Sequence, residues 1–254
     1  MKTHCMILTI DIGNTTISLG LMKGTRVVKR VTLETHANAR ILSKQLTAVL
    51  RKLRSAKISR AAICSVVPSK TKSVEECILR VLGLPTVVIG RDIAVPLTNR
   101  YRNPKQVGQD RLVGAYAALK LYGAPAIVID FGTAITFDVV SAKKEYLGGI
   151  IVPGLRLSAE SLFNKTALLP RVKIQCPRSL IGRDTQGSIL SGLFYGYGAL
   201  SSGLIDRIAK TIKGNPKVII TGGHLKLVKR FISRQVNVID PDLVFHGITL
   251  LLAL

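Results

Sequence analysis

Tryptophan is absent from this 254-residue sequence, and aromatic residues of all kinds make up only 5% of it. Hydrophobic residues nevertheless account for 47%, so any core must be mainly aliphatic. This composition is typical of a folded chain and excludes an intrinsically disordered one. The length allows one large domain or two modest ones with a sizeable core.

Cysteine is scarce, and its four copies are far apart, at Cys5, Cys64, Cys77 and Cys176. No CxxC pair occurs, which argues against both a disulfide framework and a zinc site. The pattern predicts reduced thiols and a cytoplasmic protein.

Long hydrophobic runs are also lacking. The first apolar segment leads directly into Asp11 without a signal-type cleavage region. The last one, residues 243–254, is too short to cross a bilayer and contains His246. We therefore expect a soluble protein with no membrane partner.

Acidic residues are few: 14 Asp and Glu stand against 37 Lys and Arg, a formal net charge of +23. Such an excess suits a polyanionic partner such as nucleic acid, or small phosphorylated substrates. The basic residues are scattered along the sequence, and no aromatic residues alternate with them as a stacking platform requires. The sequence thus favours a general basic bias over a nucleic-acid partner.

Several common catalytic and nucleotide-binding motifs are missing. The sequence has no GxxxxGK[ST], no GxGxxG, no kinase His-Arg-Asp loop, no HExxH and no GxSxG. These absences argue against the P-loop, Rossmann, metalloprotease and serine-hydrolase classes.

Hydrophobic periodicity predicts a mixture of strands and helices. Strands are expected at residues 6–12, 16–22, 26–33, 61–67, 86–89, 126–130, 134–140, 145–152, 217–220 and 236–239. Helices are expected at residues 38–54, 70–82, 110–122, 155–164, 185–212 and 243–252, with a further one after Gly222-Gly223.

One pattern occurs twice in the sequence. Residues 10–15 (IDIGNT) and 129–134 (IDFGTA) each place an apolar strand, an Asp and a Gly-containing turn before two further strands. The two Asp residues, Asp11 and Asp130, lie 119 positions apart. The repeat predicts a duplicated α/β fold in which each half has a mixed sheet with helices on its faces. We expect the halves to be residues 1–108 and 109–254.

An Asp at the end of a strand, followed by a Gly turn, can serve two purposes. It can simply form a tight hairpin, with Asp as the turn former. It can also bind phosphate through backbone amides while the carboxylate holds Mg²⁺. One copy would favour the plain turn, whereas two copies in register favour a nucleotide cleft. The strand that runs into Gly222-Gly223 supports this, because paired glycines allow a ribose or base to approach closely.

These features resemble the actin, sugar-kinase and heat-shock ATPase superfamily, which has duplicated ribonuclease-H-like domains. Along nearly its whole length the chain is similar to type III pantothenate kinases. The stretches that carry the resemblance are residues 10–15, 65–68 (SVVP), 104–111 (PKQVGQDR), 130–136 (DFGTAIT), 146–155 (YLGGIIVPGL), 181–185 (IGRDT), 192–198 (GLFYGYG) and 221–223. The chain departs from the family pattern at Ile135, where a second Thr is expected.

The resemblance implies ATP-dependent phosphorylation of pantothenate to 4′-phosphopantothenate, the first step of coenzyme A synthesis. It implies that Asp110 is the catalytic base and that Tyr101, Gly108 and Arg111 bind pantothenate. It also implies a homodimer in which Thr185 of one subunit completes the pocket of the other.

For the nucleotide, the resemblance implies a hairpin in which Asp11 holds Mg²⁺ through the phosphates. It implies that Asp130 binds a monovalent cation, K⁺ or NH₄⁺. The remaining ATP-binding residues that it implies are Gly13, Asn14, Thr15, Gly132, Thr133, Gly222 and Gly223.

Other interpretations stay open from the residues alone. Asp110 could cap the helix that starts beside it, and Arg111 could be a solvated surface residue. The chain could phosphorylate another small alcohol. It could also be a non-enzymatic regulator or nucleic-acid-binding accessory protein on the same fold, although such a protein need not keep Asp11, Asp110 and Asp130 together.

Overall fold

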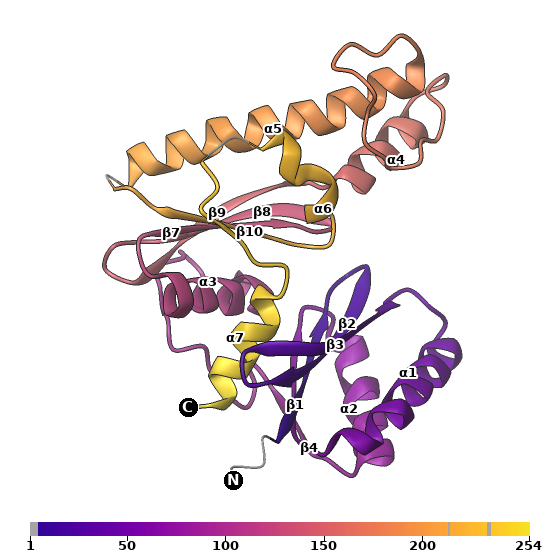
Figure 1. Ribbon diagram of the computed structural model, residues 1–254, viewed down its shortest axis with the longest axis vertical. Helices are drawn as coiled ribbons and strands as arrows, with labels where there is room; N and C mark the ends of the chain where they lie inside the picture. The colour runs from indigo at the N-terminus through magenta and orange to yellow at the C-terminus, as the bar shows by residue number, and fades with distance from the viewer. Residues whose placement is uncertain (1–4, 213, 233–234) are drawn as a thin grey trace. The chain divides into compact units, whose positions relative to one another are not determined.

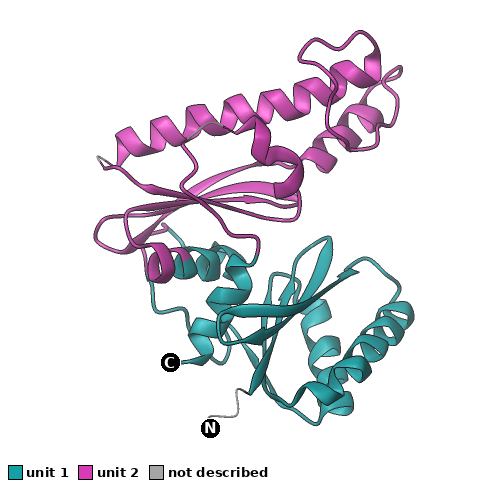
Figure 2. Cartoon of the chain, in the orientation of Figure 1, with its two compact units in different colours: residues 1–97, 102–117, 242–254 teal, residues 98–101, 118–241 magenta. Residues whose placement is uncertain are grey.

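The computed structural model describes residues 5–212, 214–232 and 235–254, and the chain forms two compact units (Figure 2). Unit 1 consists of residues 1–97, 102–117 and 242–254, and unit 2 of residues 98–101 and 118–241. The expected halves, 1–108 and 109–254, describe the sequence repeat and stay a prediction. The compact units follow a different division, because the C-terminal helix α7 (Leu243–Leu252) packs on the first sheet.

Unit 1 is built on a five-stranded mixed sheet in the order β3-β2-β1-β4-β5 (Figure 1). The central strand β1 is antiparallel to β2 and parallel to β4. The strands are β1 (Met6–Ile12), β2 (Thr16–Lys23), β3 (Arg26–Glu34), β4 (Ile58–Ser65) and β5 (Thr86–Val88).

Helices cover both faces of this sheet. Leu8, Ile10 and Ile12 of β1 share a core with α1 (Ala39–Leu53) and α2 (Pro68–Leu82). Residues of the opposite face, including Cys64, pack with α3 (Gln109–Tyr122) and α7. Because strand side chains alternate between faces, Asp11 lies on the α3 and α7 side.

Unit 2 repeats the same strand order. Its sheet runs β11-β10-β7-β8-β9-β6, and β7 is antiparallel to β8 and parallel to β10. The strands are β6 (Thr98–Asn99), β7 (Ala126–Phe131), β8 (Ala134–Val140), β9 (Glu145–Pro153), β10 (Lys217–Thr221) and β11 (Val238–Ile239). The arrangement β3-β2-β1-β4-β5 of unit 1 thus recurs as β9-β8-β7-β10-β11, which confirms the predicted duplication.

One face of the second sheet is covered by α4 (Leu155–Lys165), α5 (Thr185–Thr211) and α6 (Leu225–Val228), with α5 lying along the strands in Figure 1. Ile127, Ile129 and Phe131 of β7 belong to that core. Asp130 therefore lies on the opposite face, as Asp11 does in unit 1. Short 3-10 helices complete the chain at Arg54–Ala56, Pro104–Gln106 and Lys229–Phe231.

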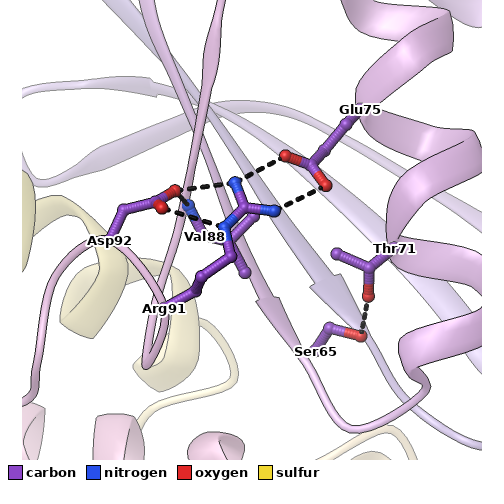
Figure 3. Close-up of polar contacts among 6 residues, drawn as sticks. All are labelled: Ser65, Thr71, Glu75, Val88, Arg91 and Asp92. Atoms are coloured by element: carbon purple, nitrogen blue, oxygen red, sulfur yellow. Dashed lines mark hydrogen bonds and ion pairs between the residues drawn. The ribbon is translucent and has the colours of Figure 1, made fainter.

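The end of β4 differs from the predicted strand 61–67. The strand starts earlier and ends at Ser65, whose hydroxyl accepts a hydrogen bond from the Val67 amide (3.1 Å). It also accepts one from the Thr71 hydroxyl (2.8 Å) (Figure 3). Pro68 then begins α2, two residues before the predicted helix, because proline suits the first helical position. The two-residue strand β6 carried no sequence signal.

Two chain-wide expectations concern cysteine and membranes. All four cysteines are free thiols, as predicted. Within the part of the chain that the structure describes, no helix combines the length and apolarity needed to cross a bilayer.

Two helical glycines of unit 1 should respond oppositely to alanine. A β-carbon on Gly247 would lie 2.6 Å from both Val113 Cγ1 and the Val113 carbonyl oxygen, whereas one on Gly114 meets nothing closer than 4.0 Å. We expect Gly247→Ala to destabilise unit 1 by roughly 1–3 kcal/mol through overpacking. The matched variant Gly114→Ala should be neutral or stabilising by up to about 1 kcal/mol. Urea unfolding midpoints measure both, and equal shifts would contradict the packing of α7 on α3.

Candidate functional site

The hairpin after β1 is held in place by Thr35, the residue that follows β3. The Thr35 amide donates to the Thr15 carbonyl (2.9 Å), and its hydroxyl donates to the Gly13 carbonyl (2.7 Å). Thr35 is only 2% exposed, while Asn14 at the tip is exposed. The carbonyls of Gly13 and Thr15 thus accept hydrogen bonds from Thr35, a buried residue of the same unit.

The hairpin after β7 is held at the equivalent place. Gly154, which follows β9, donates its amide to the Thr133 carbonyl (3.0 Å). A β-carbon on Gly154 would lie 2.3 Å from that oxygen, so only glycine allows the contact. Thr133 at the tip is exposed, as Asn14 is in the first hairpin. The two predicted phosphate hairpins therefore share their construction as well as their sequence.

The Gly222-Gly223 turn lies directly against the second hairpin. Gly222 has a φ of +104°, and a β-carbon there would lie 2.3 Å from Asp130 Oδ1 and 2.5 Å from the Phe131 nitrogen. The next residue, His224, donates its amide to the Phe131 carbonyl (3.0 Å). Within unit 2 the structure thus brings together Asp130, the hairpin and the paired glycines, and glycine is required for the close approach. Such a cradle fits a nucleotide.

His224 and Arg156 were not singled out by the sequence. Burial lowers the pKa of His224, a hydrogen bond to the Gly132 backbone acts in the opposite direction, and the nearby Arg156 guanidinium lowers it further. The imidazole is therefore neutral at pH 7. Arg156, in the first turn of α4, places a positive charge near the hairpin. In the sequence, His224 is marked only by its position directly after Gly222-Gly223, and Arg156 only by its position two residues after Gly154.

The segment that carries Asp110 lies in unit 1. Gly108 precedes α3 and accepts the first helical hydrogen bond from Leu112 (3.3 Å). Asp110 lies inside the first turn, and its Oδ1 accepts from the Arg111 amide (2.8 Å). A β-carbon on Gly108 would lie 2.5 Å from Asp110 Oδ1, so glycine makes room for the carboxylate. A capping interaction therefore exists, although Asp110 is not the N-cap residue.

Two carboxylates of unit 1 approach the same buried thiol. Asp11 on β1 is the register partner of Cys64 on β4. Burial raises the pKa of the Cys64 thiol well above its ordinary value, and the negative charges of Asp11 and Asp110 raise it further. Asp11 from the sheet and Asp110 from α3 therefore both act on this thiol, which stays protonated at neutral pH.

The loop after β5 supports the start of α3. Arg91 binds Glu75 through two nitrogens (2.8 and 3.1 Å) and Asp92 at 2.8 Å (Figure 3). Hydrogen bonds from Arg91, together with one from the backbone, lower the pKa of Asp92 to about 2. Gly90 in this loop has a φ of +89°, and a β-carbon there would lie 2.6 Å from Gln109 Cδ. The braced loop thus contacts the residue that precedes Asp110.

Two predicted substrate residues belong to unit 2. Tyr101 packs on Gly148, where a β-carbon would lie 3.1 Å from Tyr101 Cδ2. Thr185 is exposed and begins α5, after Asp184 has capped the helix by accepting from the Gly187 amide (2.6 Å). Gly108, Asp110 and Arg111 lie together at the start of α3 in unit 1, whereas Tyr101 and Thr185 belong to two separate segments of unit 2.

A buried carboxylate, Asp138, was missed. It is 2% exposed and accepts hydrogen bonds from the Thr136 hydroxyl (2.9 Å) and the Tyr146 hydroxyl (2.7 Å). By strand alternation it shares its sheet face with Asp130. Among the residues that the structure describes, no three His, Cys, Asp or Glu side chains are grouped as metal ligands. A cation at Asp11 or Asp130 would therefore need phosphate, carbonyl or water oxygens as well, which hard cations accept.

Comparison with known proteins gives consistent results. A family model described as type III pantothenate kinase matches residues 7–207. A type III pantothenate kinase from Sulfurihydrogenibium sp. (strain YO3AOP1) is 38% identical over 247 residues, covering 96% of this chain and 98% of that protein.

Solved structures show the same fold at lower identity. A Baf family transcriptional activator from Campylobacter jejuni has a TM-score of 0.61 at 20% identity and covers 97% of both chains. A ROK family glucokinase from Streptomyces griseus, solved with glucose and AMPPNP, has a TM-score of 0.53 at 12% identity, covering 97% of this chain and 98% of that one. These likenesses confirm the actin-like, sugar-kinase type of α/β fold. From the family match and the identity over nearly its whole length, the chain belongs to the type III pantothenate kinase family.

Proposed function

We propose that this chain transfers the γ-phosphoryl group of ATP to the hydroxyl of pantothenate, giving 4′-phosphopantothenate and ADP in the cytoplasm. The observation that supports it most strongly is that Asp11 lies on the sheet face covered by α3, the helix whose first turn carries Asp110. Phosphoryl transfer asks the protein mainly for positioning and charge neutralisation, and two carboxylates with separate tasks meet that demand.

Asp110 acts as the general base. Its Oδ1 is oriented by the Arg111 amide, and Gly108 leaves space beside it. A carboxylate held in this way can accept the proton that the hydroxyl of pantothenate loses as it attacks phosphorus. Gly108, Arg111 and Tyr101 bind the rest of pantothenate.

The two hairpins bind the phosphates. Thr35 and Gly154 donate to hairpin carbonyls. We assign the phosphate contacts to the hairpin tips, with the side chains of Asn14, Thr15 and Thr133 as donors. The glycine-rich turn at Gly222 and Gly223 suits the adenosine. Arg156 adds positive charge.

Cations complete the charge balance. Asp11 would hold Mg²⁺ through the phosphates, which neutralises the charge that develops on the transferred group. Asp130 would hold a monovalent cation, K⁺ or NH₄⁺, next to the second hairpin. The contact of Gly222 with Asp130 supports this role, since it places nucleotide-binding backbone beside that carboxylate.

The active form is a homodimer in which Thr185 enters the partner's pocket. The apolar residues of α5 do not carry this proposal, because Leu190, Leu193 and Phe194 are buried in the core of unit 2. The exposed face of α5 supports it instead. Gly192, Gly196 and Gly203 lie there with nothing within 4 Å of a β-carbon position, which allows another backbone to approach closely.

The central test is an ADP-release assay with and without pantothenate, in K⁺ and in Na⁺ buffer. We expect release to require pantothenate and K⁺, and Asp110→Asn to lower kcat on the order of 10²- to 10⁴-fold while the protein stays folded. Glu76→Gln is the matched control, because that carboxylate lies on the exposed side of α2 and should leave kcat almost unchanged. Release without pantothenate, or with another small alcohol only, would overturn the substrate assignment.

The clamp on the first hairpin gives a second prediction. Thr35→Val removes the hydroxyl bond to Gly13, and the loss of one hydrogen bond of about 0.5–1.5 kcal/mol should raise KM for ATP roughly 2- to 10-fold. Thr35→Ser should restore KM, and Thr32→Val on the exposed part of β3 serves as control. If Thr35→Val changes KM for pantothenate but not for ATP, the hairpin does not bind the nucleotide.

The dimer proposal is tested by subunit exchange. Asp110→Asn and Thr185→Arg should each be inactive alone, whereas a mixed dimer has one pocket with both defects and one with neither. Activity should therefore return to part of the wild-type level after exchange, measured by the same ADP release. Complete inactivity in a mixture whose exchange is proven by tagged subunits would mean that each pocket is built within one chain.

A further inference from the structure

Residues 35–74 contain nine basic residues and not a single acidic one. The stretch begins after Glu34 and ends before Glu75. It holds α1, the following 3-10 helix, β4 and the first half of α2. This stretch of unit 1 therefore supplies nine of the chain's 23 net positive charges.

Helix geometry gathers four of these cations on one face. We call these cations the basic stripe: Arg40, Lys44, Arg51 and Arg54. Their spacing of four, seven and three residues places them on one side of a helix, over a length of about 21 Å. The opposite side of α1 is apolar and buried. It is formed by Leu42, Leu46, Leu50 and Leu53.

The cations of the basic stripe are exposed and not neutralised. In the described part of the chain no ion pair joins any of them to a carboxylate. Glu75 on the neighbouring helix is occupied by Arg91 instead. Like charges one turn apart repel each other, so the stripe opposes the helix that carries it.

The stripe lies among hydroxyl groups on the exposed face of the same helix. That face carries Arg40, Ser43, Lys44, Thr47, Ala48 and Arg51. Two hydroxyls thus stand among three cations, and no carboxylate belongs to this face. Hydroxyls and cations in this mixture are the groups that contact phosphate oxygens in protein–nucleic acid complexes.

We propose that the basic stripe of α1 binds the phosphodiester backbone of duplex nucleic acid. Charge complementarity selects a polyanion, and the row of cations matches a line of phosphates. The sequence argued against nucleic acid because its basic residues are scattered and lack interleaved aromatics. In the folded protein, however, four of these basic residues lie on one face of a helix. The lack of aromatic residues argues against single-stranded nucleic acid, whose bases need stacking partners. It does not argue against a duplex that is bound through its backbone.

A membrane surface fits this helix less well. An amphipathic helix that lies in a bilayer interface must free its apolar side, and that side of α1 is buried in the core of unit 1. The stripe is also separate from the carboxylates, because α1 covers the sheet face opposite to Asp11. Binding there goes beyond the proposed kinase activity and does not depend on it.

The test compares three proteins of the full chain with a fluorescent DNA duplex. In the stripe variant, Arg40→Gln, Lys44→Gln and Arg51→Gln are combined. In the matched control, Lys143→Gln, Lys173→Gln and Lys226→Gln remove the same charge from exposed sites of unit 2. Anisotropy titrations between about 50 and 200 mM salt give the slope of log K against log salt, about −0.9 for each phosphate neutralised.

We expect the stripe variant to lose most of its affinity and to have a slope shallower by about 2.7, while the control keeps both. A charge-conserving variant, Arg40→Lys with Arg51→Lys, should retain binding, and ADP release should be unchanged in all of them. Equal losses in the stripe variant and the control would overturn the proposal in favour of diffuse attraction. It would also be overturned by no binding at the lowest salt, or by stripe-dependent binding to anionic lipid vesicles only.

Discussion

The site depends above all on hydrogen bonds that hold each phosphate hairpin from behind. Thr35 pairs the carbonyls of Gly13 and Thr15, and Gly154 pairs the carbonyl of Thr133. Both clamps come from the residue after the third strand of their sheet, so the antiparallel meander positions its own binding loop. The carbonyls of Gly13, Thr15 and Thr133 therefore have hydrogen-bond donors inside the protein. Loosening either clamp would leave carbonyl oxygens without these donors beside the proposed phosphates, whose negative charge they would repel.

The two units use the same scaffold for different tasks. In both, the penultimate residue of the central strand is an Asp on the sheet face away from the paired covering helices. The parallel neighbour then differs: Cys64 of β4 stands beside Asp11, while β10 runs into Gly222 beside Asp130. In unit 1, α3 supplies a second carboxylate, that of Asp110. The missing side chain at Gly222 instead lets backbone approach Asp130, which suits a nucleotide.

Scarce acidic residues explain much of the electrostatics. Several are used in pairs or buried hydrogen bonds, as are Glu75 and Asp92 with Arg91, Glu145 with Arg100, Asp138 with Tyr146, and Asp240 with Tyr122. Asp11 and Asp110 of unit 1 and Asp130 of unit 2 are the candidate functional carboxylates. Few carboxylates are then left to neutralise the surface, and α1 has none at all. The basic stripe is thus exposed without acidic neighbours for two reasons: acidic residues are few, and many of them interact with other parts of the chain.

The sequence by itself determined the elements and the repeat, because β-branched strands, helical spacing and two Asp-Gly turns are local patterns. It also indicated most of the site: Asp11, Asp110, Asp130 and Gly222 were named from motifs and resemblance. It could not find Thr35, Asp138 or His224, since a hydroxyl after a strand, an Asp within a strand and a His after two glycines carry no distinctive local signal. Nor could it show that two carboxylates act on Cys64, or that Arg40, Lys44 and Arg51 form no ion pair with any carboxylate that the structure describes. Those facts depend on strand register and on which helix face is buried, and only the tertiary structure decides them, because contacts between distant residues set both.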